Sequence, residues 1–239
     1  MSDLIFRGIA ASSLDDVYIS KMPDHRKASM RYSEYYVKGR DGALHVDEGL
    51  ANFDLTATLI MINGLPATRQ LINAWADGTG KLVTSDQPGF AYEATVKEEI
   101  QWTRVLSNKI DGVQRFHDAA VITWNCQPYM VEAVDSIIVL DEPGETSAFT
   151  NPGSAKAIPF IEVNGSGDVT FSVNGNEISI ANMTTGVPVY LDSATGYVYT
   201  AEGATAMTGD FPVLEMGENT VTLGTGVTSI RITPHWRWI

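Results

Sequence analysis

Apolar and polar residues alternate along much of this chain with a period of two, which is the pattern of β-strands that bury one face. In residues 52–61 the odd positions from Phe53 to Met61 are apolar, and the even positions up to Thr58 are polar. In residues 120–127 the even positions are apolar and end at Cys126. We therefore interpret Cys126, the only cysteine, as a core residue rather than a reactive thiol.

One segment has the pattern of a helix. Pro66 suits the first helical turn, and Gly78 with Gly80 supplies a stop signal. The apolar stripe between them consists of Leu71, Ile72 and Trp75. A single short helix among strands makes the first half α+β.

The second half is rich in turn signals and has no helical pattern after about residue 130. Asn174–Gly175 suits a type I′ hairpin, a second hairpin is predicted through residues 192–196, and a third at Gly224 and Gly226. This half is predicted to be a β-sandwich. The protein as a whole is predicted to be mainly β, with an N-terminal domain of residues 1–132 and a C-terminal domain of residues 133–239.

The last residues continue one apolar face. Ile230, Ile232, Trp236 and Trp238 lie at even positions, whereas the odd positions are polar or charged. Pro234 cannot donate to a strand ladder, so it indicates a sheet edge or a bend. We predict that these four residues anchor the core of the second domain and that the terminal residues form its closing strand.

The chain carries 16 Lys and Arg against 29 Asp and Glu, a formal charge of −13. This excess of acidic residues excludes a protein that binds nucleic acid through its phosphates. Arg7 and Asp3 interrupt any apolar signal core at the start, and no apolar run reaches the roughly 18 residues of a membrane span. We expect synthesis and folding in a cytoplasm, without a membrane partner.

The sequence singles out no catalytic, cofactor-binding or metal-binding residue. It has neither a phosphate-binding loop nor a nucleophile elbow, and its four histidines are scattered. Asp192, Asp210 and Glu218 stand near turns, where calcium sites can form, but acids favour turns for local hydrogen bonding as well. A spatial pair of carboxylates for hydrolysis stays open, because sequence cannot reveal it.

Several fragments, in this order along the chain, carry a resemblance to a known family. They are F-R-G at residues 6–8, V-K-G-R-D-G at 37–42, W-A-D-G-T-G-K-L at 75–82, C-Q-P-Y at 126–129, N-P-G-S-A-K-A-I-P at 151–159, N-G-S-G-D at 164–168, G-D-F-P-V-L at 209–214, G-E-N-T-V at 217–221 and the terminal P-H-W-R-W. Together they resemble the distal tail protein (Dit) family of long-tailed bacteriophages, from end to end.

The resemblance implies a structural virion protein without enzyme activity. It implies an N-terminal domain that forms a ring, usually a homo-hexamer and in some cases two stacked rings, and a C-terminal galectin-like β-sandwich. Such a ring is a baseplate hub at the tail tip, joining the major tail tube protein to the tail-associated lysin or the tail fibre and receptor-binding proteins. DNA passes through its channel without specific binding.

Two further hypotheses concern surfaces. Arg40 and Asp41 are predicted at a hairpin tip, as subunit contacts or as an ordinary solvated turn. The alternative function is a carbohydrate-binding module that aids adhesion to the host cell wall, with Tyr190, Tyr197 and Tyr199 as exposed candidates. A cell-wall hydrolase is a third class, for which no residue pair stands out.

Overall fold

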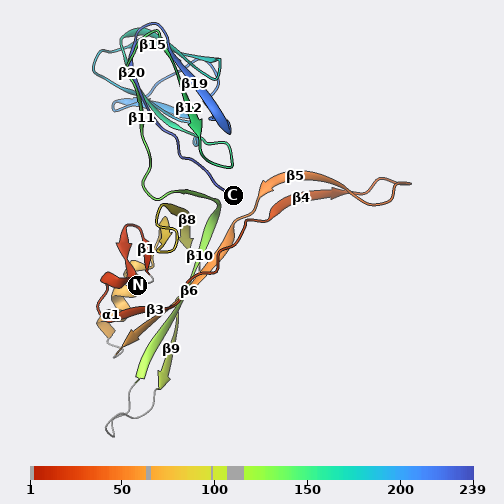
Figure 1. The fold of residues 1–239 in the computed structure, drawn as a ribbon, viewed down its shortest axis with the longest axis vertical. Coiled ribbons are helices and arrows are strands. Elements are labelled where there is room, and N and C mark those ends of the chain that lie inside the picture. The colour runs from red at the N-terminus through yellow and green to blue at the C-terminus, as the bar shows by residue number, and fades with distance from the viewer. Residues whose placement is uncertain (1–2, 63–65, 98, 107–115) are drawn as a thin grey trace. The chain divides into compact units, whose positions relative to one another are not determined.

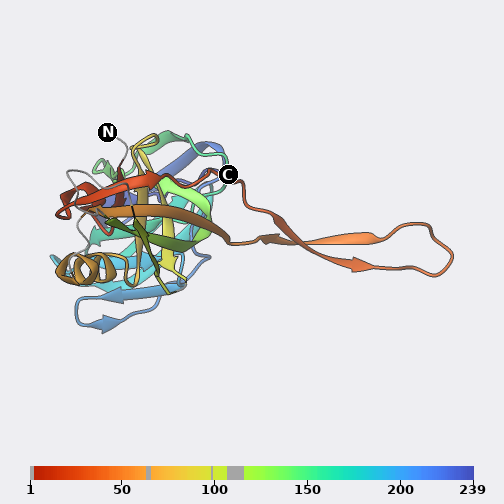
Figure 2. The same ribbon diagram turned by 90° about the horizontal axis from the view of Figure 1, so that it is seen from below.

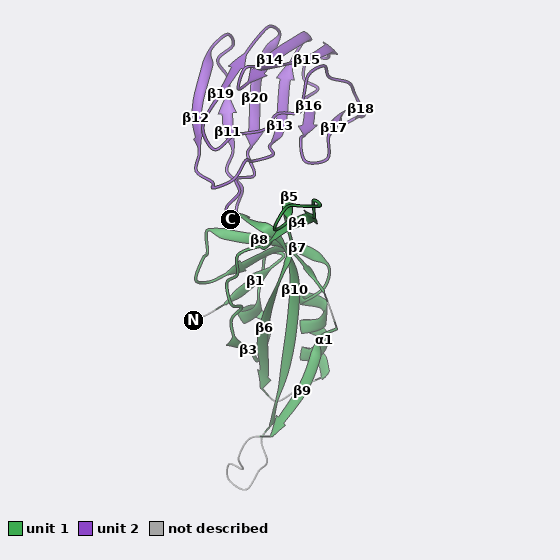
Figure 3. Ribbon diagram, turned by 90° about the vertical axis from the view of Figure 1, so that its right-hand side faces the viewer, with its two compact units in different colours: residues 1–133, 239 green, residues 134–238 purple. Residues whose placement is uncertain are grey.

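The computed structural model describes residues 3–62, 66–97, 99–106 and 116–239. The chain divides into two compact units, one of residues 1–133 with residue 239 and one of residues 134–238 (Figure 3). Both consist mainly of strands, so the mainly β fold class is confirmed. We describe each unit by itself.

Unit 1 is built on an eight-stranded antiparallel sheet (Figure 1). Its strands follow the order β2-β1-β7-β8-β10-β6-β3, and β9 pairs with β10 beside β8. The elements in chain order are β1 (Leu4–Phe6), β2 (Ile9–Ala10), the 3₁₀ turn η1 (Ala11–Ser13), β3 (Val17–Lys21), β4 (Met30–Tyr35), β5 (Leu44–Leu50), β6 (Phe53–Ile62), α1 (Pro66–Trp75), β7 (Thr79–Thr84), β8 (Phe90–Val96), β9 (Gln101–Leu106) and β10 (Phe116–Glu132).

The core of unit 1 follows from the alternation in β6 and β10. The odd positions of β6 from Leu55 to Met61 are buried, and so are the even positions of β10 from Ala120 to Cys126, as predicted. Phe6, Trp75 and Trp124 meet edge to face at the centre, with ring centroids 6.0–6.1 Å apart. Such pairs add to the energy of burial. Strand β1, helix α1 and strand β10 are thereby joined in one core.

Helix α1 occupies the predicted position, but its buried residues and the residues that follow its end differ from the prediction. Ile72 and Trp75 are buried together with Thr68, whereas Leu71 is 47% exposed. A ten-residue helix lying on a sheet buries a narrow strip, and Leu71 lies outside it. Gly80 is not part of the stop but lies inside β7, where a Cβ atom would come within 2.6 Å of the Arg7 side chain.

Unit 2 is a β-sandwich. Its six-stranded sheet has the order β11-β20-β13-β16-β17-β18, its four-stranded sheet has the order β12-β19-β14-β15, and residues of both sheets form one core. The strands are β11 (Ile138–Leu140), β12 (Thr146–Asn151), β13 (Phe160–Gly165), β14 (Gly167–Val173), β15 (Asn176–Met183), β16 (Val189–Asp192), β17 (Tyr197–Thr200), β18 (Gly203–Ala204), β19 (Gly217–Leu223) and β20 (Val227–Thr233).

Two of the three predicted hairpins are present in unit 2. Asn174 and Gly175 both have positive φ angles, 52° and 82°, as a type I′ turn between β14 and β15 requires. The turn between β16 and β17 is held by the Asp192 carboxylate, which accepts the amide N–H groups of Ala194 and Thr195.

The third predicted hairpin is wrong. Strands β19 and β20 flank the turn at residues 224–226, but they lie in different sheets and do not pair. The turn instead hydrogen-bonds to β14, where Gly224 N–H donates to the Thr170 carbonyl at 2.9 Å and Thr170 N–H donates to the Thr225 carbonyl at 2.9 Å. Both flanking strands bury alternate residues in one core. The apolar alternation in the sequence is therefore the same whether the turn joins two strands of opposite sheets or two paired strands of a hairpin.

Candidate functional site

The most exposed structure in the described chain is a two-stranded ribbon formed by β4 and β5, which we call the arm (Figure 2). It is a sheet of its own, separate from the eight-stranded sheet. None of the 13 residues of its two strands is buried. An isolated two-stranded hairpin is marginally stable in water, so this length of ordered arm favours a partner surface.

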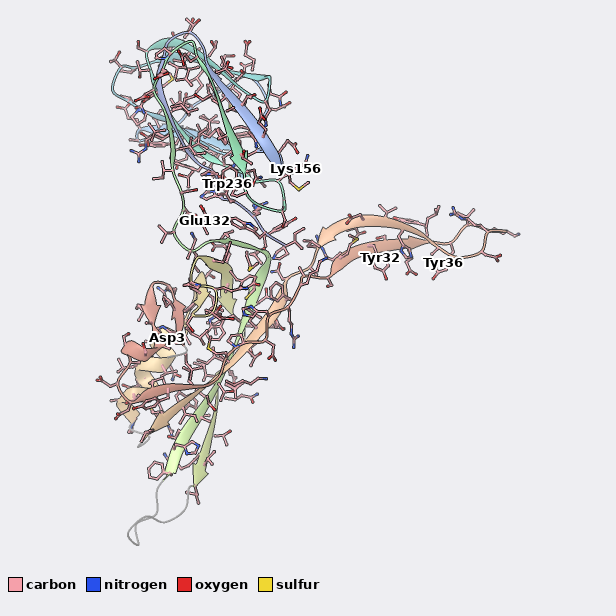
Figure 4. The ribbon with its side chains drawn as sticks, viewed as in Figure 1. Asp3, Tyr32, Tyr36, Glu132, Lys156 and Trp236 are labelled. Carbon is pink, nitrogen blue, oxygen red and sulfur yellow. The ribbon has the colours of Figure 1, made fainter. Side chains whose placement is uncertain are left out.

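Large apolar side chains on the arm face solvent. Tyr35, Leu44 and Val46 lie on one face and are 58%, 39% and 51% exposed. Tyr36, which follows β4, is 78% exposed (Figure 4). Contiguous apolar side chains that find no core within their own chain mark an interaction surface.

The other face of the arm carries a small polar network. Tyr32 stacks on His45 with ring centroids 4.6 Å apart, and the His45 ring lies 3.5 Å from the Glu34 carboxylate. These contacts join β4 to β5 on this face, whereas the opposite face carries Tyr35 and Val46 beside a hydrogen bond from the Ser33 hydroxyl to the Glu48 carboxylate. The two faces of the arm therefore differ, as the two sides of a docking element do.

The arm is close to neutral in an acidic chain. Residues 30–50, which span β4, β5 and their connecting loop, hold three Lys and Arg and four acids, whereas the rest of the chain holds 13 Lys and Arg and 25 acids. Arg40 and Asp41 lie in the loop that joins β4 to β5, as the pattern predicted, and both are exposed. The arm therefore carries almost none of the net negative charge of the chain.

The arm could have been inferred from sequence only in part. Residues 30–37 place five large apolar side chains among polar and charged residues without clear alternation, and Gly39 and Gly42 both take positive φ angles in the connecting loop. A strand pair that buries neither face has no hydrophobic period to reveal it. Only the turn residues pointed to a hairpin at this position.

The four predicted anchor residues of unit 2 differ in burial. Ile230 and Ile232 are fully buried and Trp236 is 4% exposed, whereas Trp238 is only partly buried against the same core. The predicted closing strand through the last residues is wrong, because β20 ends at Thr233. The chain bends at Pro234 and at His235, whose backbone has a positive φ angle of 53°. Beyond the bend, Arg237 forms an isolated antiparallel β-bridge with Ala155.

A charged cluster joins helix α1 to strands β9 and β10 in unit 1. The Asp118 carboxylate is buried and accepts hydrogen bonds from Arg69 at 2.5 Å and from Arg104 at 2.8 Å. The guanidinium groups of Arg104 and Arg69 hold the pKa of Asp118 down at about 2. Each guanidinium also lies over an aromatic ring, Arg69 on Trp102 and Arg104 on Phe116. Sequence could not reveal this cluster, since its members lie 14 and 49 residues apart.

The remaining candidates for chemistry have structural roles. Cys126 is buried, and burial raises the pKa of its thiol to about 12. His25 pairs with Asp86 at 2.5 Å, and His235 faces the Ile158 carbonyl at 3.3 Å. Within the described residues no group of three or more His, Cys, Asp or Glu could hold a metal ion. The described helix, with ten residues, is too short to cross a membrane.

A surface groove of about 290 Å³ lies along β3 and η1. Asp3 and Asp16 line it together with apolar side chains of β3. Asp3 is already engaged, because its carboxylate accepts the Ser12 N–H at 3.1 Å and the Ser12 hydroxyl at 2.5 Å. Its evident role is to hold η1 against β1, and the groove offers no pair of free carboxylates facing each other.

No protein-family model matches the chain, and no curated protein matches it. Among solved structures it is similar to the SPP1 Dit (gp 19.1) protein, described as a paradigm of hub adsorption apparatus in Gram-positive infecting phages, with a TM-score of 0.72 and 14% identity over 98% of each chain. A chain of the phage p2 baseplate in its activated conformation with Sr gives a TM-score of 0.51 and 7% identity over 97% of each chain. The chain therefore has the fold of Dit along its whole length, as the resemblance in its sequence predicted.

Proposed function

We propose that this chain is a structural component of a phage tail tip, a hub that assembles from identical copies into a ring. The observation that carries the proposal is the likeness of fold to the SPP1 hub protein over 98% of both chains. A likeness of fold does not carry function alone. The arm supplies the independent support, because it is an ordered element with exposed apolar side chains, and none of its strand residues is buried against its own chain.

The arm fits the requirement of a ring. A closed ring needs head-to-tail contacts between two different surfaces of the subunit. The arm of one copy would supply one surface, and the acidic body of the next copy the other. We propose six copies, with Arg40 and Asp41 at the arm tip among the subunit contacts.

The proposed hub is not an enzyme and resides in the virion. Its partners are the tail tube protein on one face and the tail-associated lysin or fibre proteins on the other. Six copies with a formal charge of −13 each give −78. We propose that acidic residues also line the channel, where a negative wall repels the phosphates of passing DNA and lets the DNA slide through without binding.

The oligomer is tested by light scattering coupled to size exclusion and by electron micrographs of the purified protein. Six chains of 26.0 kDa give about 156 kDa, and ring-shaped particles are expected. A monomer at every workable concentration would contradict a self-sufficient ring.

The arm is tested by placing Lys at Tyr35 and Val46, on one of its faces. Because no residue of β4 or β5 is buried, the double variant keeps the body of unit 1 folded but loses its apolar contact. We expect a ring that dissociates at higher protein concentration than the wild type. Tyr197→Lys, at a side chain of unit 2 that is 51% exposed, is the matched control. An unchanged ring in the double variant would remove the arm from the subunit contact, and an unchanged ring in Arg40→Glu would remove Arg40.

A further inference from the structure

The six-stranded sheet of unit 2 carries a continuous aromatic strip on the face turned away from the core. The strip consists of Phe160 on β13, Tyr190 on β16, and Tyr197 and Tyr199 on β17. Successive ring centroids are 5.9 Å apart for Phe160–Tyr190, 5.4 Å for Tyr190–Tyr199 and 5.7 Å for Tyr197–Tyr199. Neighbouring rings are inclined by only 20–35°.

The alternation of the strands fixes this orientation. Ile161, Leu191 and Val198, which stand beside the strip residues in sequence, are buried in the sandwich core. Side chains of successive residues point to opposite faces of a sheet, so the aromatic strip points outward. Tyr197 is 51% exposed, and the other three rings are partly exposed.

Polar groups border the aromatic strip in register with it. Glu162 pairs across the strands with Tyr190, and Arg231 pairs with Glu162 on its other side. The tyrosine hydroxyl groups can donate and accept, and a carboxylate such as Glu162 accepts. The face therefore combines apolar rings with hydrogen-bonding groups at their margin, which is how proteins hold a ligand that is itself both apolar and hydroxylated.

Charge narrows the class of ligand. Residues 134–238 contain 12 Asp and Glu and three Lys and Arg. An anionic polymer, such as a teichoic acid or a nucleic acid, is repelled by such a surface. A neutral sugar chain meets no such barrier, and the C–H faces of its rings suit aromatic side chains while its hydroxyl groups suit the polar margin.

We propose that the aromatic strip binds a neutral polysaccharide chain on the host surface. The strip spans three adjacent strands of the sheet, so it offers contact to more than one sugar ring. This role is separate from the proposed ring, whose contacts lie on the arm of unit 1.

Affinity electrophoresis of the full chain tests the proposal. The probes are soluble neutral polysaccharides, namely hydroxyethyl cellulose, galactomannan, mannan, and the neutral polysaccharide of a Gram-positive wall stripped of teichoic acid, with purified teichoic acid as the anionic comparison. We expect at least one neutral polymer, and not teichoic acid, to retard the protein. Tyr197→Ala and Tyr199→Ala should each weaken that retardation about tenfold, since a contact of about 1.4 kcal/mol corresponds to a factor of ten.

Matched controls separate binding from folding and from ring assembly. Tyr18→Ala, at a tyrosine of unit 1 that is 50% exposed, should leave the retardation unchanged. Tyr197→Phe keeps the aromatic side chain and should retain most of the polysaccharide binding. Light scattering on the same variants should show the wild-type oligomer, so loss of binding and loss of the ring are distinguishable. Absence of retardation by all the neutral polymers, or retardation that survives both alanine variants, would overturn the proposal and leave the rings as cross-strand pairs that stabilise the sheet.

Discussion

Replacing Asp118 by Asn is the sharpest test of how unit 1 holds its helix and the β9–β10 pair together. The substitution keeps the size of the side chain but removes the charge that faces Arg69 and Arg104. A pKa lowered from 3.8 to about 2 corresponds to about 2.4 kcal/mol of stability at neutral pH. Since the two arginine side chains are 37% and 49% exposed, water screens the pair, and we expect a loss of about 1–2 kcal/mol.

The pH dependence gives this prediction a sign. The carboxyl group of Asp118 has a lower pKa in the folded chain than in the unfolded chain, so its contribution is complete above about pH 5. It is lost as the pH falls through about 4 toward 2. The difference in stability between wild type and Asp118→Asn should therefore shrink over that interval.

Hydrogen exchange of β10 peptides in increasing urea measures the stability of unit 1 separately from unit 2. Asp24→Asn removes a fully solvated pair with Lys21, in which the side chains are 70% and 63% exposed, and should change the stability by less than about 0.5 kcal/mol. If Asp118→Asn were as stable as wild type at pH 7, or if its deficit did not change between pH 5 and pH 2, the reasoning from a buried, charge-paired carboxylate would be refuted.

Two further predictions concern unit 2. Trp236→Ala should destabilise unit 2 by about 3 kcal/mol and Trp238→Ala by clearly less, because Trp236 is 4% exposed whereas Trp238 is only partly buried. Hydrogen exchange of β20 peptides measures both losses. Equal losses would contradict the assignment of Trp236 as the anchor. Gly224→Ala places a Cβ atom 2.6 Å from the Thr170 carbonyl oxygen and should lower the stability of unit 2 by about 1–3 kcal/mol in the same assay. Gly89→Ala is the control in unit 1 and should leave stability unchanged, because its Cβ would have nothing within 4 Å. Tolerance of Gly224→Ala would show that the turn can shift away from β14.

The sequence predicted what local periodicity determines. Leu55 and Ile122 lie in the core because a strand with one buried face must alternate, and Asn174–Gly175 turns back because few residues accept two positive φ angles. Which strand pairs with which is not determined by the local sequence. The strands on either side of Gly224 alternate in the same way whether they pair with each other or lie in opposite sheets.

The candidate site was less predictable than the fold for the same reason. The hairpin tip at Arg40 could be read from its glycines, but the absence of burial along the arm could not, since Tyr35 and Val46 look like residues of an ordinary strand. In the charged cluster, Asp118 acquires its partners only when α1 and β9 come together. Interactions between distant segments leave no period in the sequence.

Strand β10 has a mechanical consequence. It pairs along one side with β6 over ten registered residues, His117 to Cys126, and along the other with β9 and then with β8. A force directed along β10 would load these pairings in shear, so that many backbone hydrogen bonds would have to fail together rather than one after another. Unit 1 should therefore be stiffest along this strand, and single-molecule pulling between its two ends should require more force than pulling across the sheet.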